Sequence, residues 1–286
     1  MYDLLIKYNL ITEDSVEKYY SKVRDRDDIQ VYKSNEIIFL SRTDHTDVSY
    51  YNEKKYLKHW GELDRKVGMK SGLEDMQRRT DSIKYLVSNK KWLDVGSGLG
   101  EILESLGDTA NECIAVEPQD SKRKVLQEAG FNVYPLTEDI KEVDFDIVTM
   151  FHVLEHLDEP IEVLKQIREK MTDNGKIVIE VPHARDFLLS FLDLDDFKEF
   201  TLWSEHLILH TRNSLRVFLE EAGFKDITIQ GCQRFPLANH LHWLKEKKPG
   251  GHNKWSQLRT EGLDKEYESM LNSLDMTDTI TAFATK

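Results

Sequence analysis

The stretch LDVGSGLG, residues 93–100, decides the fold of this chain. The residues before its first glycine, Trp92–Val95, have the apolar pattern of a strand, and Glu101–Leu106 after its last glycine have the pattern of a short helix. Glycine permits a tight turn and a close approach of a ligand to the backbone, and the start of a helix offers unpaired N–H groups. The stretch therefore predicts a strand, a ligand-binding loop and a helix in succession.

A carboxylate follows the next strand pattern. Cys113–Val116 reads as a strand that ends in Glu117, which lies 19 residues beyond Gly98. A carboxylate in this place can accept hydrogen bonds from both ribose hydroxyls of an adenosine. The loop and Glu117 together fit either a nicotinamide dinucleotide or S-adenosylmethionine.

Two details favour S-adenosylmethionine over the dinucleotide. The third glycine, Gly100, comes one residue earlier than in the dinucleotide fingerprint, and the next position is Glu101. An acidic side chain at the helix start would oppose a pyrophosphate, whereas it is compatible with a ligand that carries a sulfonium and an amino group. Asp94, on the strand before the loop, is placed to bind the ammonium of such a ligand.

Outward from the loop, strand and helix patterns alternate as far as residue 231. Near-continuous apolar strands that alternate with helices indicate a mostly parallel sheet with helices on both faces. Asn174-Gly175 has the composition of a turn before the fifth strand. We expect helices at 101–106, 121–129, 160–171 and 214–222, and strands at 92–95, 113–116, 132–136, 145–150, 176–181, 227–230 and 279–285.

The pattern divides the chain into an N-terminal extension, residues 1–89, and a main domain, residues 90–286, with a lid-like insert at 232–278. In the extension, 29–32 and 36–40 read as two short strands around a Lys33–Asn35 turn, and a helical pattern runs over 52–88. We expect the extension to cap the cofactor. Aromatic residues gather at its centre and fit core packing best: Tyr50, Tyr51, Tyr56, His59 and Trp60.

Charge and cysteine content exclude several classes. The chain has 39 Lys and Arg against 52 Asp and Glu, a net charge of −13, which argues against a nucleic-acid substrate. Its two cysteines, Cys113 and Cys232, lack metal-ligand spacing, so we expect no metal site. No stretch approaches the ~20 apolar residues of a membrane span, and the N-terminus lacks the pattern of a secretory signal. These features predict a cytoplasmic protein; the oligomeric state is not indicated.

Four segments in this order resemble the successive motifs of class I S-adenosylmethionine-dependent methyltransferases. They are LDVGSGLG, IAVEP (114–118), DFDIVTMFHVLEHLDEP (144–160) and NGKIVIEVPH (174–183). The resemblance covers roughly residues 80–231. It implies a Rossmann-like sheet of seven strands in the order 3-2-1-4-5-7-6, with residues 279–285 as the antiparallel seventh. It also implies S-adenosylmethionine as cofactor and S-adenosylhomocysteine as product.

The resemblance further implies the cofactor contacts. Residues of the first loop would line the methionine part, Glu117 would hold the ribose, and residues after the second and third strands would meet the adenine. Phe151 and His152 would lie beside the methionine moiety. The full set is Asp94, Gly96, Ser97, Gly98, Gly100, Glu117, Pro118, Gln119, Glu138, Phe151 and His152. In the extension, Arg78 and Arg79 are candidates for the methionine carboxylate.

His152 and His156 are four residues apart in a string that resembles the zinc pattern H-x-x-E-H. That pattern needs a distant third ligand, and here it follows a core strand, so we expect no zinc. Histidine suits general-base catalysis near neutral pH, and His152 and His156 are catalytic candidates. For His156 and Glu155 a structural role in shaping the pocket remains equally open.

Residues 203–206, Trp-Ser-Glu-His, resemble the Tyr-x-Glu-His segment of sugar methyltransferases, including C-methyltransferases of nucleotide-linked deoxysugars. In those enzymes the Glu-His pair lies over the acceptor and the histidine is the base, which makes Glu205 and His206 catalytic candidates. Trp203 replaces the tyrosine, and the paired cysteines of the N-terminal zinc module are missing, so O- or N-methylation is favoured over C-methylation.

The sequence therefore predicts a methyltransferase that O-methylates a small-molecule acceptor, a sugar or sugar nucleotide of a bacterial surface polysaccharide such as capsule. A phosphate on the acceptor would need basic side chains, which Arg185, Arg212 and Arg234 can supply. Several alternatives remain open: another small acceptor such as a quinone-type hydroxyl, an amine or a carbon; a cofactor-binding protein without catalysis; and an NAD-dependent oxidoreductase.

Overall fold

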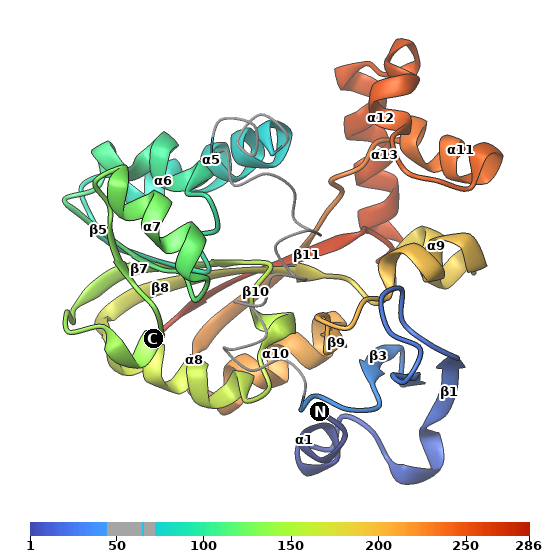
Figure 1. Ribbon diagram of the computed structural model, residues 1–286, viewed down its shortest axis with the longest axis horizontal. Helices are drawn as coiled ribbons and strands as arrows, with labels where there is room; N and C mark the ends of the chain where they lie inside the picture. Colours follow the sequence, from blue (N-terminus) through green and yellow to red (C-terminus); the bar gives the residue numbers. More distant parts are fainter. Residues whose placement is uncertain (45–64, 66–71) are drawn as a thin grey trace. The chain divides into compact units, whose positions relative to one another are not determined.

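The computed structural model describes residues 1–44, 65 and 72–286. Its largest element is a seven-stranded sheet in the order β10-β11-β8-β7-β4-β5-β6 (Figure 1). Counted along the chain from β4, this order is the predicted 3-2-1-4-5-7-6, so the Rossmann-like fold is confirmed. The strands are β4 (Lys91–Val95), β5 (Glu112–Val116), β6 (Asn132–Tyr134), β7 (Phe145–Phe151), β8 (Met171–Pro182), β10 (Lys225–Cys232) and β11 (Thr279–Thr285).

The direction of the strands also agrees with the prediction. β4 pairs in parallel with β5 and β7, and β5 pairs in parallel with β6. At one end of β11 the Asp278 carbonyl accepts from His183 N, and at its other end Lys286 N donates to the Gly175 carbonyl. Residue numbers rise along β11 while they fall along β8, so these two strands are antiparallel.

Helices cover both faces of this sheet. On one side lie α5 (Leu73–Val87), α6 (Glu101–Leu106) and α7 (Asp120–Glu128), and on the other lie α8 (Pro160–Glu169) and the end of α10 (Arg212–Glu221) (Figure 1). Pro160 begins α8, where its missing N–H costs nothing. The apolar core beneath the first group of helices joins residues of α5, β4, α6 and α7, among them Ile83, Trp92, Leu103 and Leu126.

One local expectation is wrong. Asn174-Gly175 is not a turn before the fifth strand but lies inside β8, which begins at Met171 and directly follows α8. A Cβ on Gly175 would stand 2.9 Å from the Thr172 carbonyl oxygen and 3.0 Å from that of Phe145. The glycine is therefore required by close backbone approach within the sheet, which a turn composition does not distinguish.

The chain forms two compact units, which we describe separately. Unit 1 comprises Met1–Thr43, Glu180–Val217 and Ile229–Ala282, and unit 2 comprises Asp44–Ile179, Phe218–Thr228 and Phe283–Lys286. The division expected from sequence, with a cap over 1–89 and a lid-like insert over 232–278, stays a prediction.

Unit 1 contains a second, four-stranded sheet in the order β1-β2-β3-β9, which is antiparallel throughout. The predicted hairpin is present, with its turn at Asn35-Glu36 rather than over 33–35. Both turn residues have positive φ, 48° and 68°, as the tight two-residue turn requires. The other elements are β1 (Glu17–Tyr20), β2 (Val31–Ser34), β3 (Ile37–Leu40), β9 (Ile208–Leu209), α1 (Tyr2–Lys7), α9 (Asp195–Thr201), α11 (Leu237–Glu246), α12 (Gly251–Lys254) and α13 (Glu261–Ser273).

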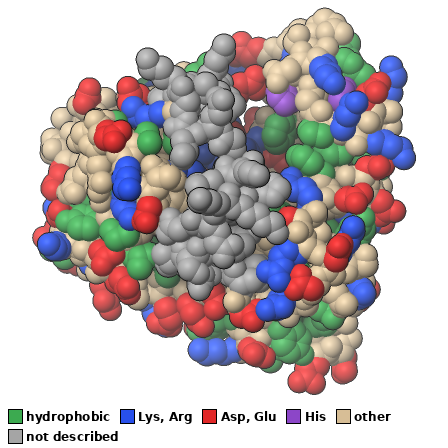
Figure 2. Space-filling model, in the orientation of Figure 1, with side chains coloured by type: hydrophobic (Ala, Val, Ile, Leu, Met, Phe, Trp, Pro, Cys, Tyr) green, Lys and Arg blue, Asp and Glu red, His purple; other side chains and the backbone are tan. Residues whose placement is uncertain are grey.

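The expected aromatic cluster at 50–60 and most of the helical pattern before residue 72 lie outside the described residues. Among the helices that the structure describes, none is long and apolar enough to cross a membrane. Acidic side chains are spread over the face drawn in Figure 2, as the net charge of −13 requires.

Candidate functional site

The glycine loop in unit 2 is shaped by packing that excludes any side chain. Gly96 and Gly100 have φ of +76° and +80°, in the left-handed region. A Cβ on Gly96 would stand 2.3 Å from Val153 Cγ2, and a Cβ on Gly100 would stand 2.5 Å from Leu126 Cδ2. The loop thus joins the carboxyl end of β4 to α6 with no room for a side chain at Gly96 or Gly100.

Glu117 joins the loop to the end of β5. It is only 4% exposed, and its Oε2 accepts from Gly98 N at 2.8 Å while its Oε1 accepts from Gln119 N at 2.8 Å. Burial raises the pKa of Glu117, and Lys122 and the two backbone N–H groups oppose that rise. Each carboxylate oxygen keeps a second lone pair, so the group can still accept from ribose hydroxyls.

Asp94 lies at the end of a buried chain of hydrogen bonds. Trp92 Nε1 donates to Thr149 Oγ1 at 2.8 Å, and Thr149 Oγ1 donates to Asp94 Oδ1 at 2.6 Å. Burial raises the pKa of Asp94 to about 6, against an ordinary value of 3.8. A cationic amine nearby would favour the ionised form. Asp94 was predicted from the sequence, whereas Thr149 and Trp92 were not, because their pairing depends on the register between β4 and β7.

Two residues after β5 and one after β6 were expected near the adenine. Gln119 is 2% exposed, and its Oε1 is buried without a hydrogen-bond partner among the described residues. Such an acceptor suits an amino group of a ligand. Pro118 is half-buried and its carbonyl accepts from Arg123, whereas Glu138 is exposed in a short 3-10 helix, Thr137–Asp139.

The end of β7 brings an aromatic ring, a cation and two histidines together. The Arg79 guanidinium lies 4.9 Å from the centre of the Phe151 ring. His152 follows with φ +54°, a conformation that costs free energy for a residue with a side chain. His152 Nδ1 lies 3.0 Å from Oε1 of the fully buried Glu155, and His156 Nε2 lies 3.8 Å from the same oxygen.

Of the two candidate arginines, Arg79 lies at this edge of the sheet, while Arg78 pairs with Asp75 on α5. Arg65 was not predicted from the sequence. Its Nε donates to the Leu99 carbonyl at 2.9 Å and its Nη2 to Glu104 at 2.6 Å. Arg65 therefore fixes the loop and the first turn of α6, and no sequence spacing signals this long-range contact.

These residues fit S-adenosylmethionine. The Glu117 carboxylate can accept from ribose hydroxyls and that of Asp94 from an amine, and Gln119 Oε1, which has no partner among the described residues, can accept from a ligand amino group. An acidic residue, Glu101, begins α6 directly after the loop. The donor and acceptor set therefore suits a cationic adenosyl ligand better than a pyrophosphate.

The other two catalytic candidates belong to unit 1. Glu205 is fully buried, and the turn that carries it is closed by a bond from His206 N to the Trp203 carbonyl. Ser204 anchors this turn, since its N and Oγ donate to the Asp25 carboxylate at 3.0 and 2.6 Å. The catalytic roles of Glu205, His206, His152 and His156 stay predictions.

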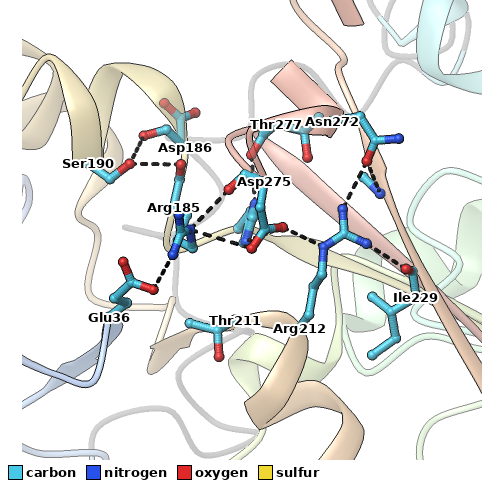
Figure 3. Close-up of polar contacts among 12 residues, drawn as sticks. Glu36, Arg185, Asp186, Ser190, Thr211, Arg212, Ile229, Asn272, Asp275 and Thr277 are labelled. Carbon is cyan, nitrogen blue, oxygen red and sulfur yellow. Dashed lines mark hydrogen bonds and ion pairs between the residues drawn. The ribbon is translucent and has the colours of Figure 1, made fainter. Parts of the chain in front are cut away.

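Two of the three arginines proposed for an acceptor phosphate line one cavity of about 440 Å³ in unit 1. Arg185 pairs with Glu36 and donates to the Asp275 carbonyl, and Arg212 pairs with the Asp275 carboxylate (Figure 3). The third, Arg234, is not among the cavity residues; its N donates to Asp278. The cavity offers both donors and acceptors to a polar ligand.

Comparison with known proteins places the chain in a family. A model of the methyltransferase domain matches residues 70–229, more than half of the chain, and the chain belongs to this family. It is an S-adenosylmethionine-dependent methyltransferase, and S-adenosylmethionine is its cofactor.

Individual relatives are more distant. The chain is 32% identical over 131 residues to the mitochondrial ubiquinone biosynthesis O-methyltransferase of Candida albicans, covering 41% of this chain and 39% of the relative. It is 24% identical over 208 residues to the tRNA U34 carboxymethyltransferase of Proteus mirabilis, covering 67% and 57%. The matches thus span about two fifths to somewhat over half of these relatives' length.

A solved S-adenosylmethionine-dependent methyltransferase from Archaeoglobus fulgidus has a similar fold. Its TM-score is 0.51 at 21% identity, with 82% of this chain and all of that chain covered. At this identity the likeness supports the fold alone.

Proposed function

We propose that this methyltransferase O-methylates a small hydroxyl-bearing molecule, a sugar or a sugar nucleotide that carries phosphate. The observation that carries the proposal is the Glu205-His206 turn, with a polar cavity in the same unit. β9 connects the two, because it begins two residues after His206 and ends two residues before Thr211. Thr211 and Arg212 both line the cavity.

In this proposal, residues of the chain bind the cofactor, orient the acceptor and remove the proton of the acceptor hydroxyl. Bound S-adenosylmethionine supplies an electrophilic methyl group on a sulfonium. Glu117 and the loop hold the adenosyl part, and Asp94 holds the amine. His206 would accept the proton of the acceptor hydroxyl through an imidazole nitrogen, and the buried Glu205 would stabilise the imidazolium that forms. Much of the rate gain comes from alignment of acceptor and methyl group.

The cavity supports an acceptor with both hydroxyl and phosphate groups. Arg185 uses its Nε and Nη1 on Asp275 and Glu36, and its Nη2 has no partner among the described residues. That edge of the guanidinium can pair with a phosphate. Glu36 and Asp275 can accept from sugar hydroxyls. The net charge of −13 favours such a small acceptor over tRNA.

A second candidate acceptor is a quinone-type hydroxyl. It is favoured by the 32% identity to the Candida albicans ubiquinone O-methyltransferase. The same base would serve, since a phenolic and a sugar hydroxyl both lose a proton on methylation.

Turnover with a panel of acceptors tests the proposal. Product masses are measured with sugar nucleotides, a soluble quinol analogue and tRNA. We expect methylated sugar nucleotide, and we expect His206→Ala to lower kcat by ~10²–10⁴-fold while the Kd for S-adenosylmethionine is unchanged. His252→Ala, in the same unit on α12, is the matched control. Native turnover by His206→Ala would remove this residue from the mechanism, and methylation of tRNA alone would overturn the acceptor.

A further inference from the structure

Helix α11 buries three polar side chains together with Ala238 and Trp243, and it exposes two leucines. Asn239, His240 and His242 are at most 4% exposed, whereas Leu241 and Leu244 are 39% and 50% exposed. The two leucines are three residues apart and therefore share one face of the helix. In most helices of globular proteins such leucines face the core and such polar side chains face water.

The buried polar face is fixed by hydrogen bonds, so the helix cannot turn to bury its leucines. His240 Nδ1 bonds the Tyr267 hydroxyl of α13 at 2.6 Å, and His242 Nδ1 donates to the Lys248 carbonyl at 2.7 Å. Asn239 Oδ1 accepts from the N–H groups of Gly250 and Gly251. Rotation of α11 would leave all these buried groups unpaired, at a cost of ~1–3 kcal/mol each.

The segment around this face has a charge opposite to that of the rest of the chain. Residues 234–259 carry six Lys and Arg and one acid, Glu246, for a net charge of +5, while the remaining residues carry −18. Lys245 and Lys247 directly follow the leucines and are each 70% exposed at the side chain. The basic residues are Arg234, Lys245, Lys247, Lys248, Lys254 and Arg259.

More apolar side chains are exposed in the same segment. Phe235 before α11 is 36% exposed, and Leu258 after α12 is 45% exposed. The Lys245 Nζ lies 5.5 Å from the centre of the Trp255 ring, so that cation and aromatic ring share one area. Figure 2 shows Lys and Arg side chains at the upper right, where Figure 1 draws α11 and α12.

We propose that residues 234–259 dock this protein on an anionic lipid surface. Exposed leucines and aromatic rings beside lysines are the features of helices that lie in a bilayer interface, with apolar side chains inserted and lysines near acidic headgroups. A nucleic acid would use the lysines but would leave the leucines in water. No described helix can span a bilayer, so the segment lies on the surface. The inference does not depend on which acceptor is methylated.

Flotation with lipid vesicles tests the proposal. We expect the full chain to bind vesicles of phosphatidylcholine with 30% phosphatidylglycerol, to ignore pure phosphatidylcholine, and to lose binding as salt rises. The triple variant Lys245→Glu, Lys247→Glu, Lys248→Glu should bind ~10²-fold more weakly. The pair Leu241→Gln, Leu244→Gln should bind ~10-fold more weakly.

The matched control makes an equal change in net charge outside the segment. Lys124→Glu, Lys176→Glu and Lys225→Glu replace three exposed lysines outside the segment and should keep vesicle binding. Circular dichroism and S-adenosylmethionine binding report whether each variant folds, and the lysine triple remains informative if the leucine pair does not fold. The proposal is overturned if the native chain does not bind vesicles, or if the two lysine triple variants lose vesicle binding equally. The proposal is also overturned if the chain binds tRNA through Lys245–Lys248, or dimerises through the leucines, and does not bind vesicles.

Discussion

The glycine loop of unit 2 and segment 234–259 of unit 1 both bury polar groups, but the loop buries carboxylates and the segment buries imidazoles. At the loop, buried carboxylates accept short hydrogen bonds from nearby groups, as Glu117 does from Gly98 N. In the segment, burial lowers the pKa of His240 to about 4, and leucines face outward. Acidic groups at the loop are suited to a cationic ligand, whereas the segment leaves its apolar groups and lysines for an outside surface. Local sequence patterns predict the first arrangement and miss the second.

The largest effect is expected from filling the space at Gly96. Gly96→Ala would place a methyl group 2.3 Å from Val153 Cγ2 and force a side chain to adopt φ +76°. Backbone strain and overpacking together should cost ~3 kcal/mol or more, which lowers Tm by roughly 10 °C. Thermal unfolding measures this loss.

Gly130→Ala is the matched control, because Gly130 has φ +91° with nothing within 4 Å of an added Cβ. Gly130→Ala should lower the free energy of unfolding only by the backbone strain, ~1–2 kcal/mol. Val153→Ala in the Gly96→Ala background should recover part of the difference. Equal Tm shifts for the two glycine variants would show that the loop is not tightly packed against Val153.

The pH dependence of stability should have opposite signs in the two regions. Burial raises the pKa of Asp94 to about 6 and lowers the pKa of His240 to about 4. The folded state binds the Asp94 proton more tightly than the unfolded state, so this group costs stability as pH rises from about 4 to 6. His240 binds its proton less tightly when folded, so it costs stability as pH falls from about 6.5 to 4.

Denaturant unfolding of two variants separates these contributions. Asp94→Asn should be more stable than the native chain by up to ~3 kcal/mol at pH 7 and by little at pH 4. His240→Gln should lose stability at pH 7, where it gives up the bond to Tyr267, and should lose less at pH 4. Parallel curves for both variants would contradict the assigned ionisation states.

Much of the fold follows from local patterns. The loop, the alternation of strands with helices and the resemblance to a family predict the sheet order, and Glu101–Leu106 and Thr279–Thr285 are helix and strand with the expected bounds. Residues at the carboxyl ends of parallel strands meet at one edge of the sheet. This is why Asp94, Glu117 and Phe151 could be assigned to one region from their positions alone.

What the sequence did not reveal depends on contacts between distant residues. The Thr149 bond to Asp94 depends on sheet register, and the Arg65 bond to Leu99 spans 34 residues. The region expected as a lid-like insert, 232–278, contains α11, whose Asn239, His240 and His242 find partners that lie 6 to 27 residues away. Polar residues in a helix predict an exposed face unless those partners are known.

The central claim is that Glu117 and the glycine loop hold the adenosyl part of S-adenosylmethionine. Calorimetry with S-adenosylmethionine, S-adenosylhomocysteine and NAD tests it, using Glu117→Ala and, as control, Glu112→Ala at the exposed start of the same strand. The account predicts that the native chain and Glu112→Ala bind both adenosyl ligands and not NAD. Glu117→Ala should bind at least ~10²-fold more weakly, because it loses the ribose acceptor and leaves two N–H groups unpaired. Uptake of NAD in preference to S-adenosylmethionine, or native affinity in Glu117→Ala, would contradict it.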